Sequence, residues 1–188
     1  MKTEIECRLL DVNVEKFIKK LKEHNAKFIG DWLQIRNCYD FTPVRENSWI
    51  RLRTTGEETT LTIKEISNKK IDGTKESEII VSDFNETDEI LNKLGYHARS
   101  NQENRRIRYM LDGVEIDIDF WPYIPTYVEF EAQSQEDIEK LCNKLDIDFN
   151  SLVTIDVSSI YEHYGHKFKS IQASLSLEED RKNKKFEL

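Results

Sequence analysis

Charged residues recur at every second position in several segments of this chain, which is the spacing that places side chains on one face of a β-strand. Glu4, Glu6 and Arg8 share such a face close to the start of the chain. The remaining sets of this kind are Trp49, Arg51 and Arg53; Thr62 and Lys64; Glu76 and Glu78; Arg106 and Arg108; Glu115, Asp117 and Asp119; and Glu129 and Glu131.

These sets offer two kinds of binding chemistry. Carboxylate oxygens bind hard divalent cations such as Mg²⁺, which usually share their coordination with phosphates. Guanidinium groups match phosphate oxygens with two parallel hydrogen bonds. A surface that carries both groups therefore suits a divalent metal together with a triphosphate.

The elements that carry these residues have two simple arrangements. One is an antiparallel sheet with an apolar face on helices and a polar face in water. The other is a closed barrel, and two observations favour it. Each strand keeps one sign of charge, where a merely solvated face usually mixes signs to gain cross-strand pairs. About eight strands with helices on their apolar side are also enough to close around a polar lumen. We therefore expect an α+β fold, a closed antiparallel β-barrel (tunnel) of about eight strands with helices packed outside.

Hydrophobic periodicity gives the expected positions of the elements. Alternation with period two predicts strands over residues 2–10, 33–41, 48–54, 59–66, 75–81, 104–111, 114–120 and 127–132. A period near 3.6 predicts helices over 12–28 with Asp11 as N-cap, over 85–94, after Ser134 with Asp137 in a capping box, and over 158–168. The Asp112-Gly113 pair predicts a hairpin turn. We expect one domain over residues 1–170 and a charged C-terminal tail or short helix over 171–188.

Composition excludes several classes of function. The net charge of −8 across 188 residues disfavours nucleic acid as a partner. No apolar run reaches the length of a membrane span, and glutamates occupy the place of a signal peptide's apolar core, so a cytoplasmic protein without membrane contact is expected. The three cysteines lack the paired spacing of a zinc site, and Cys7 and Cys142 are expected to face the core as reduced thiols. His163 and His166 are expected at the surface.

The charged sets, taken in order, resemble those of the CYTH, or triphosphate tunnel metalloenzyme, superfamily, which includes class IV adenylyl cyclases, thiamine triphosphatases and inorganic triphosphatases. The N-terminal ExExK signature of that superfamily resembles EIECR here, with Arg8 in place of lysine. The other similar motifs are WIRLRT, LTIK, KESEI, RRIRY, IDIDF and VEFEA, so that the series spans residues 4–131. The segment that contains Tyr161 resembles the C-terminal helix of the superfamily.

The resemblance implies roles for individual residues in a triphosphate tunnel. The implied ligands of Mg²⁺ or Mn²⁺ are Glu4, Glu6, Asp117, Asp119, Glu129 and Glu131. The implied phosphate-binding residues are Arg8, Arg51, Arg53, Lys64, Arg106 and Arg108. The implied catalytic residues are Glu4, Glu6, Arg8 and Arg106, and further candidates for the site are Glu76, Glu78 and Trp49.

Two departures from the pattern of the superfamily affect these roles. Arg8 keeps the positive charge of the usual lysine but does not deprotonate, so the resemblance supports phosphate binding by this residue and not a role as a base. The segment WPYIPTY at residues 121–127 replaces a glycine-bearing stretch, and its two prolines stiffen the connection at one mouth of the tunnel.

The chemistry implied by the resemblance is phosphoryl or nucleotidyl transfer, catalysed by positioning and charge neutralisation. We expect a metal-dependent triphosphatase that releases phosphate from tripolyphosphate, ATP or thiamine triphosphate, as a monomer or homodimer. One alternative is a class IV adenylyl cyclase that converts ATP into cyclic AMP and pyrophosphate, with Trp49, Trp121 and Tyr123 as aromatic residues that could stack on the base. The others are a non-catalytic polyphosphate or nucleotide-binding protein and a plain structural barrel, whose melting temperature would not respond to triphosphate.

Overall fold

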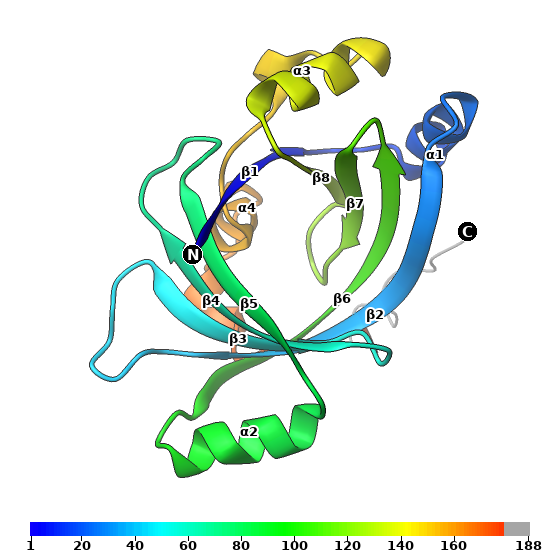
Figure 1. Cartoon of the computed structure of the whole chain (residues 1–188). Helices are drawn as coiled ribbons and strands as arrows, with labels where there is room; N and C mark the ends of the chain where they lie inside the picture. Colours follow the sequence, from blue (N-terminus) through cyan, green and yellow to red (C-terminus); the bar gives the residue numbers. More distant parts are fainter. Residues whose placement is uncertain (179–188) are drawn as a thin grey trace.

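The structure is a computed structural model, and it describes residues 1–178. Its centre is an antiparallel barrel of eight strands: β1 (Lys2–Leu9), β2 (Lys27–Tyr39), β3 (Ser48–Thr54), β4 (Thr59–Ile66), β5 (Thr74–Val81), β6 (Ala98–Leu111), β7 (Val114–Phe120) and β8 (Tyr127–Ala132). The strand order is β2-β3-β4-β5-β1-β8-β7-β6, and the pairing of β2 with β6 closes the barrel (Figure 1). The expected α+β fold with a closed barrel is confirmed.

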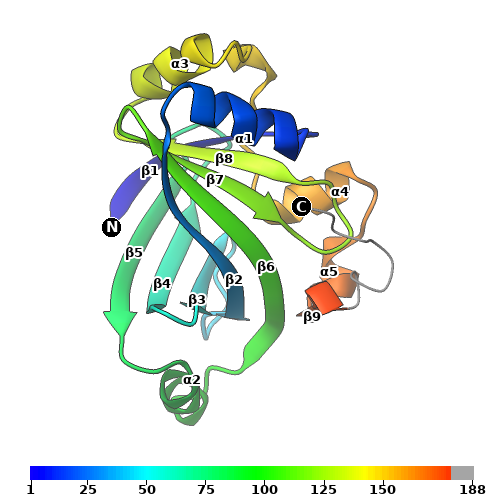
Figure 2. The same cartoon turned by 90° about the vertical axis from the view of Figure 1, so that its right-hand side faces the viewer.

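The helices lie outside this barrel or across one end of it. Their bounds are α1 (Val14–Glu23), α2 (Phe84–Lys93), α3 (Gln135–Lys144), the 3-10 helix η1 (Phe149–Ser151), α4 (Val157–His163) and α5 (Phe168–Ile171). Helices α1 and α3 pack on one side of the barrel, and α2 lies on the opposite side (Figures 1 and 2). Within residues 1–178, no helix is long and apolar enough to cross a membrane.

The largest apolar core lies between the outer face of the barrel and helices α1 and α3. Ile116 and Ile118 of β7 are fully buried there, together with Leu21 of α1 and Ile138 of α3. Because strand side chains alternate between two faces, burying this apolar set on the outside turns the intervening charged set toward the lumen. The barrel is therefore apolar outside, beneath its helices, and polar inside.

One end of the barrel is covered by residues 153–177, which we call the C-terminal cap. It contains α4, α5 and the short strand β9 (Ser174–Leu175), which pairs in parallel with Asn101 and Gln102 of β6. Figures 1 and 2 agree in placing these elements across the same end of the barrel. The Tyr161 hydroxyl donates a 2.7 Å hydrogen bond to the carbonyl oxygen of Pro122, which fixes α4 to the connection between β7 and β8.

Several expected element boundaries were wrong, for reasons that lie in single residues. The first helix begins at Val14, and its N-cap is Asn13, whose side chain accepts a hydrogen bond from the backbone N–H of Lys16; Asp11 is not the cap. The helix ends at Glu23 and not near residue 28, because Asn25 adopts a left-handed φ of 59° and the chain then enters β2. Strands β2 and β6 are both longer than expected.

The expected helix over 158–168 is interrupted. Gly165, with a φ of 82°, separates α4 from α5. Within the expected tail or short helix over 171–188, Leu175 and Leu177 are buried, and the carboxylate of Glu103 accepts a hydrogen bond from the Leu177 backbone N–H. The rest of that predicted tail, residues 179–188, lies outside the described residues.

Other local predictions are confirmed. Ser134 caps α3 and accepts a hydrogen bond from the backbone N–H of Asp137. Asp112 and Gly113 both have positive φ angles between β6 and β7, as a tight hairpin requires. Cys7 and Cys142 are buried free thiols.

Candidate functional site

The lumen of the barrel has two chemically different halves, which follow from the order of the strands. The neighbouring strands β5, β1, β8 and β7 form the acidic wall, whose carboxylates are Glu76, Glu78, Glu4, Glu6, Glu129, Glu131, Glu115, Asp117 and Asp119. The neighbouring strands β4, β3, β2 and β6 form the basic wall, whose cations are Lys64, Arg51, Arg53, Arg36, Arg106 and Arg108. They enclose a cavity of about 1150 Å³.

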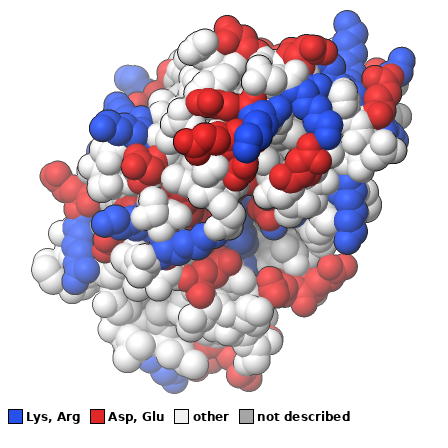
Figure 3. Space-filling view, turned by 45° about the horizontal axis from the view of Figure 1, so that its top comes forward, with Lys and Arg blue, Asp and Glu red and all other residues white. Residues whose placement is uncertain are grey.

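Within each wall, like charges face one another across neighbouring strands. Glu131 of β8 lies opposite both Glu6 of β1 and Glu115 of β7, and Arg36 of β2 lies opposite Arg53 of β3. Like charges directly opposite each other are destabilising, so a sheet selected only for stability would avoid them. On the outer face shown in Figure 3, by contrast, basic and acidic side chains are interspersed.

Opposite charges meet at the two seams between the walls. At the seam of β6 and β7, Arg106 donates hydrogen bonds of 2.8 and 2.5 Å to Asp119, and Arg108 donates two of 2.7 Å to Asp117. Arg106 also lies 2.5 Å from Asp117. Asp117 and Asp119 are consequently held behind the two guanidinium groups and do not line the cavity.

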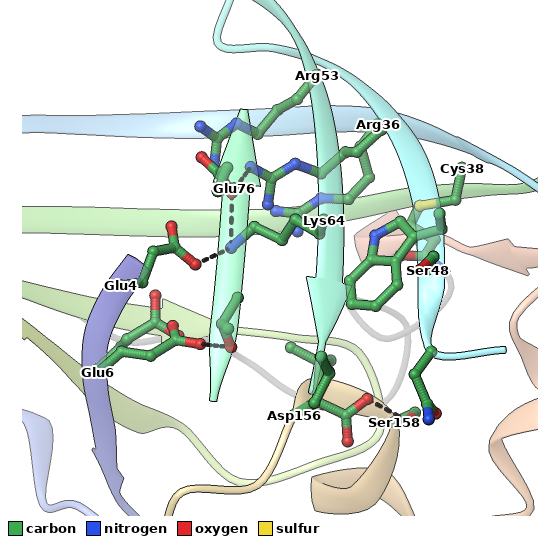
Figure 4. Close-up of a pocket in the computed structure, with 18 of the residues that line it drawn as sticks. Glu4, Glu6, Arg36, Cys38, Ser48, Arg53, Lys64, Glu76, Asp156 and Ser158 are labelled. Atoms are coloured by element: carbon green, nitrogen blue, oxygen red, sulfur yellow. Dashed lines mark hydrogen bonds and ion pairs between the residues drawn. The ribbon is translucent and has the colours of Figure 1, made fainter. Parts of the chain in front are cut away.

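The second seam joins β4 to β5. The Lys64 ammonium lies 2.9 Å from Glu4 and 2.8 Å from Glu76, as Figure 4 shows. Arg51 lies 3.4 Å from both Glu76 and Glu78. Because the Arg51 guanidinium makes only these long contacts, it is held less tightly than Arg106 and Arg108 at the β6–β7 seam.

Arg8 is the one buried cation that the acidic wall itself supplies within residues 1–178; Lys2, at the exposed start of β1, lies 3.6 Å from Glu131. Its Nη2 atom lies 2.9 Å from Glu6 and 2.5 Å from Glu129, and its Nη1 atom donates a 2.8 Å hydrogen bond to the carbonyl oxygen of Ile155. The backbones of Arg8 and Val153 also exchange two hydrogen bonds. The Arg8 side chain therefore connects two carboxylates of the wall to the C-terminal cap. A lysine, whose ammonium group has a single nitrogen, would make these contacts together less well.

The carboxylates of the acidic wall differ in how far they are neutralised. Burial raises the pKa of Glu4 to about 7, with Glu6 and Glu76 adding to the rise against the opposing effect of Lys64. Burial also raises the pKa of Glu131, and the neighbouring Glu115 contributes in the same direction. Burial acts likewise on Glu129, but Arg8 and Arg106 outweigh it and hold its pKa well below the usual range. Part of the wall therefore still favours an additional cation.

Arg36 was not among the residues predicted for the site. It is only 6% exposed and donates to the side-chain oxygens of Gln34, at 2.8 Å, and Asn104. Its guanidinium lies 4.6 Å from the ring centre of Trp121. Burial, with further contributions from Arg51 and Arg106, lowers the pKa of Arg36 to about 10. The sequence signal that could have identified Arg36 is its position between Gln34 and Cys38, at every second residue of the expected strand 33–41.

The neighbouring Arg53 is also poorly neutralised. Its nearest carboxylate is Glu78, at 3.5 Å. The positive charge of Arg51, followed by burial, lowers the pKa of Arg53 to about 9. The basic wall therefore contains two adjacent guanidinium groups that favour an additional anion.

A family model of the CYTH domain matches residues 2–154 of the chain. The chain belongs to the CYTH family. A search of curated protein sequences found no match.

Solved structures show the same barrel fold. The PH1012 protein of Pyrococcus horikoshii is 21% identical with a TM-score of 0.72, over 84% of this chain and 98% of that one. A protein of Vibrio parahaemolyticus described as a putative adenylate cyclase is 12% identical with a TM-score of 0.69, over 86% and 98%. The Hippeastrum protein HpAC1, described as a putative adenylyl cyclase with a dominant triphosphatase activity, is 14% identical with a TM-score of 0.58, over 87% and 96%. At these identities the likeness concerns the fold.

In this CYTH chain the structure brings nearly all of the predicted site residues into one cavity. Those that line it are Glu4, Glu6, Arg8, Trp49, Arg51, Arg53, Lys64, Glu76, Glu78, Arg106, Arg108, Glu129 and Glu131. Asp117 and Asp119 lie behind the β6–β7 seam. Trp121 also lines the cavity, whereas Tyr123 does not.

The donor set of this CYTH tunnel fits a divalent cation in its chemistry. Glu4, Glu6, Glu129 and Glu131 offer the hard oxygen ligands that Mg²⁺ and Mn²⁺ prefer. Glu131 is contacted by the exposed Lys2 at 3.6 Å, and burial followed by Glu115 raises the pKa of Glu131. Within residues 1–178, no three acidic, histidine or cysteine side chains are already grouped around one metal position. Several carboxylates are instead paired with Lys64, Arg8 or Arg106. Metal binding would therefore require some of them to exchange partners.

Proposed function

We propose that this CYTH-family chain is a metal-dependent enzyme that binds a triphosphate in the barrel lumen and hydrolyses it with release of phosphate. The observation that supports the proposal is the separation of the lumen into an acidic and a basic wall, each with like charges face to face. A divalent cation and a phosphate chain would neutralise the two walls together, because carboxylates suit the former and guanidinium groups the latter.

On this proposal the basic wall performs most of the binding. Arg51, Arg53 and Arg106 would donate hydrogen bonds to the non-bridging phosphate oxygens, where negative charge is concentrated during phosphoryl transfer. The seam contacts hold Arg106 in place before the substrate arrives, so little reorganisation is needed.

On the acidic wall, Glu4, Glu6, Glu129 and Glu131 would hold Mg²⁺ or Mn²⁺, which would neutralise phosphate charge and bind a water molecule. Arg8 keeps its proton and orients Glu6 and Glu129 through its two short contacts. Its role in this proposal is to position those carboxylates, and not to act as a base.

The cavity has room for more than an inorganic triphosphate. Pockets for drug-sized ligands have volumes of about 300–1,000 Å³, and this one reaches about 1150 Å³. Trp49 and Trp121 line it beside the cationic residues. An organic triphosphate such as ATP or thiamine triphosphate is therefore as reasonable a substrate class as tripolyphosphate.

Trp49 supports a second candidate, an adenylyl cyclase that converts ATP into cyclic AMP and pyrophosphate, whereas Trp121 is buried against Arg36. An indole next to the phosphate-binding wall would stack on adenine and hold the ribose near the α-phosphorus. Hydrolysis remains our first proposal, because it requires only the two charged walls.

The test is product analysis after incubation with ATP and with tripolyphosphate, each in Mg²⁺ and in Mn²⁺. We expect metal-dependent release of orthophosphate. Formation of cyclic AMP and pyrophosphate would contradict hydrolysis and support the cyclase. Binding without any turnover would contradict both and support a non-catalytic binding protein. The control variant is Arg105→Met, since Arg105 is the residue next to Arg106 but forms an ion pair with Asp31 at 2.6 Å on the outer face of β6; its activity should equal that of the wild type.

A further inference from the structure

The basic wall contains a pair of arginines that face each other across two strands. Arg36 of β2 is the direct register partner of Arg53 of β3, and both side chains line the cavity (Figure 4). In the described part of the chain, Arg36 has no carboxylate within ion-pair distance, and the only one for Arg53 is Glu78 at 3.5 Å. Two guanidinium groups are thus placed together with little to neutralise them.

Placing these groups together costs free energy. Like charges directly opposite in a sheet are destabilising, and a buried charge without a counter-charge is more costly still. Arg36 is 6% exposed, and it has only neutral acceptors, Gln34 and Asn104. A residue that served stability alone would be expected to have a carboxylate partner, as Arg106 and Arg108 do on β6.

Arg36 is nevertheless held firmly. The guanidinium carbon of Arg36 lies 4.6 Å from the ring centre of Trp121. The side-chain oxygen of Gln34 accepts a 2.8 Å hydrogen bond from the Arg36 guanidinium. Asn104 accepts from Arg36 and in turn donates a 2.9 Å hydrogen bond to Asp119, which binds Arg106. The guanidinium therefore has a fixed orientation and a polar connection to the β6–β7 seam.

The position of Arg36 also completes the series of cations around the wall. The strand order β4, β3, β2, β6 places Lys64, then Arg51 and Arg53, then Arg36, then Arg106 and Arg108. Without Arg36, β2 would contribute no cation to the lumen, and the arginines of β3 and β6 would be separated there by uncharged side chains. An extended anion such as a phosphate chain would meet a continuous cationic surface only when Arg36 is present.

We propose that Arg36, together with Arg53, binds a phosphoryl group of the substrate, and that it links the two halves of the phosphate site on β3 and β6. This inference rests on the proposed function, since it names a further residue of the same site. It also predicts chain-length selectivity: a three-phosphate chain spans the wall and uses Arg36, whereas pyrophosphate binds on one side of it.

The experiment compares wild type, Arg36→Met and Arg105→Met by calorimetric titration with tripolyphosphate and with pyrophosphate, and by thermal unfolding without ligand. For Arg36→Met we expect the tripolyphosphate affinity to fall about tenfold to a hundredfold, which is the loss of one or two charge-assisted hydrogen bonds. The pyrophosphate affinity should fall less. The melting temperature without ligand should stay unchanged or rise. Arg105→Met should bind both ligands as the wild type does.

A purely structural role for Arg36 predicts the reverse pattern. If Arg36→Met melts well below the wild type or fails to fold, or if it binds tripolyphosphate normally, the inference is wrong. Arg36→Lys adds a second check, because it keeps the charge without the planar fork and should retain part of the affinity. If the wild type itself does not bind tripolyphosphate, the proposed function is wrong. If the wild type binds it and Arg36→Met binds it with the same affinity, only the role of Arg36 is contradicted.

Discussion

The two walls of the barrel are both made of four neighbouring antiparallel strands, but they differ in how their charges are neutralised. The acidic wall contains Arg8 in its middle, which neutralises Glu6 and Glu129 through short contacts. The interior strands of the basic wall, β2 and β3, contain no carboxylate directed into the lumen, and Arg36 and Arg53 remain close together. The acidic wall is therefore partly self-neutralised, and the basic wall depends more on an external anion.

This difference separates residues that hold the barrel together from residues that are available for a ligand. At the β6–β7 seam, buried opposite charges are matched by short hydrogen bonds, so removing one partner leaves an uncompensated charge. Inside the walls, charges of one sign oppose each other, so removing one relieves repulsion. Each of the following variants tests one side of that distinction.

The largest effect on stability is expected at the β6–β7 seam. Arg106→Met leaves Asp119 buried without its counter-charge and leaves Asp117 with Arg108 alone, so we expect the free energy of unfolding to fall by about 3–5 kcal/mol. Urea unfolding monitored by circular dichroism measures it. The matched control is Arg105→Met, which loses only a partly exposed ion pair with Asp31 and should cost at most about 1 kcal/mol. Equal effects of the two variants would contradict the structural role of the seam.

The next effect is pH-dependent and concerns Glu4. Its pKa is about 7 in the folded chain, raised mainly by burial, against 4.5 as the ordinary value. Between these values the folded state binds more protons than the unfolded state, so the stability of the wild type falls as pH rises. Glu4→Gln lacks this titrating group. As the pH rises through this range, the free energy of unfolding of Glu4→Gln should therefore increase relative to that of the wild type, to about 1–3 kcal/mol above it.

Unfolding of Glu4→Gln and wild type by urea at about pH 5 and about pH 8 measures this change. The control is Glu65→Gln, at the neighbouring position to Lys64 on the opposite face of β4. A stability difference between Glu4→Gln and wild type that is the same at both pH values would show that Glu4 is not held in a crowded acidic wall.

A smaller effect is expected for Arg8→Lys. The positive charge remains near Glu6 and Glu129, but the hydrogen bond to the Ile155 carbonyl oxygen is lost, so we expect a destabilisation of about 1 kcal/mol. Amide hydrogen exchange should increase mainly in residues 153–163, since those residues follow the lost contact. Unchanged exchange in that segment would contradict the connection between Arg8 and the C-terminal cap.

The smallest effect is expected inside the basic wall. Arg53→Met removes one of two opposed guanidinium groups and only a 3.5 Å contact with Glu78, so the free energy of unfolding without ligand should rise by about 0.2–1 kcal/mol. Thermal unfolding at low ionic strength shows it most clearly, because salt screens the repulsion. A clear destabilisation would mean that Arg53 is already neutralised within the protein.

Much of the barrel was predictable because most strands alternate apolar and polar residues, and this alternation separates the face that packs on the helices from the charged face. Ile116 and Ile118 indicate the outer face of β7 in the same way that Asp117 and Asp119 indicate its inner face. The helix boundaries at Asn13 and Asn25 were not predictable in this way, because a helix cap or a left-handed backbone conformation depends on one residue and its neighbours. The C-terminal cap was also not predictable, since Leu175 and Leu177 become buried only through contacts with distant strands.

The site was predictable as a set of residues but not as an arrangement. The sequence pattern identifies which charges share a face of one strand, but the seams depend on which strands are neighbours, and periodicity does not contain the strand order. Asp117 and Asp119 therefore became metal candidates, although Arg106 and Arg108 cover them. Arg36 was missed because the residues that share its strand face, Gln34 and Cys38, are uncharged. Alternation could have placed Arg36 on that face, but the position of β2 between β3 and β6 is needed to show that the face belongs to the basic wall.

The central claim is that the two walls bind a phosphate chain together with a divalent cation, and calorimetric titration of the full chain with tripolyphosphate, with and without Mg²⁺ or Mn²⁺, tests it most directly. The account predicts one tripolyphosphate per chain, tighter binding when the metal is present, and loss of binding when Arg51 and Arg53 are both replaced by Met. Absence of binding under both conditions, or unchanged binding by the double variant, would contradict it.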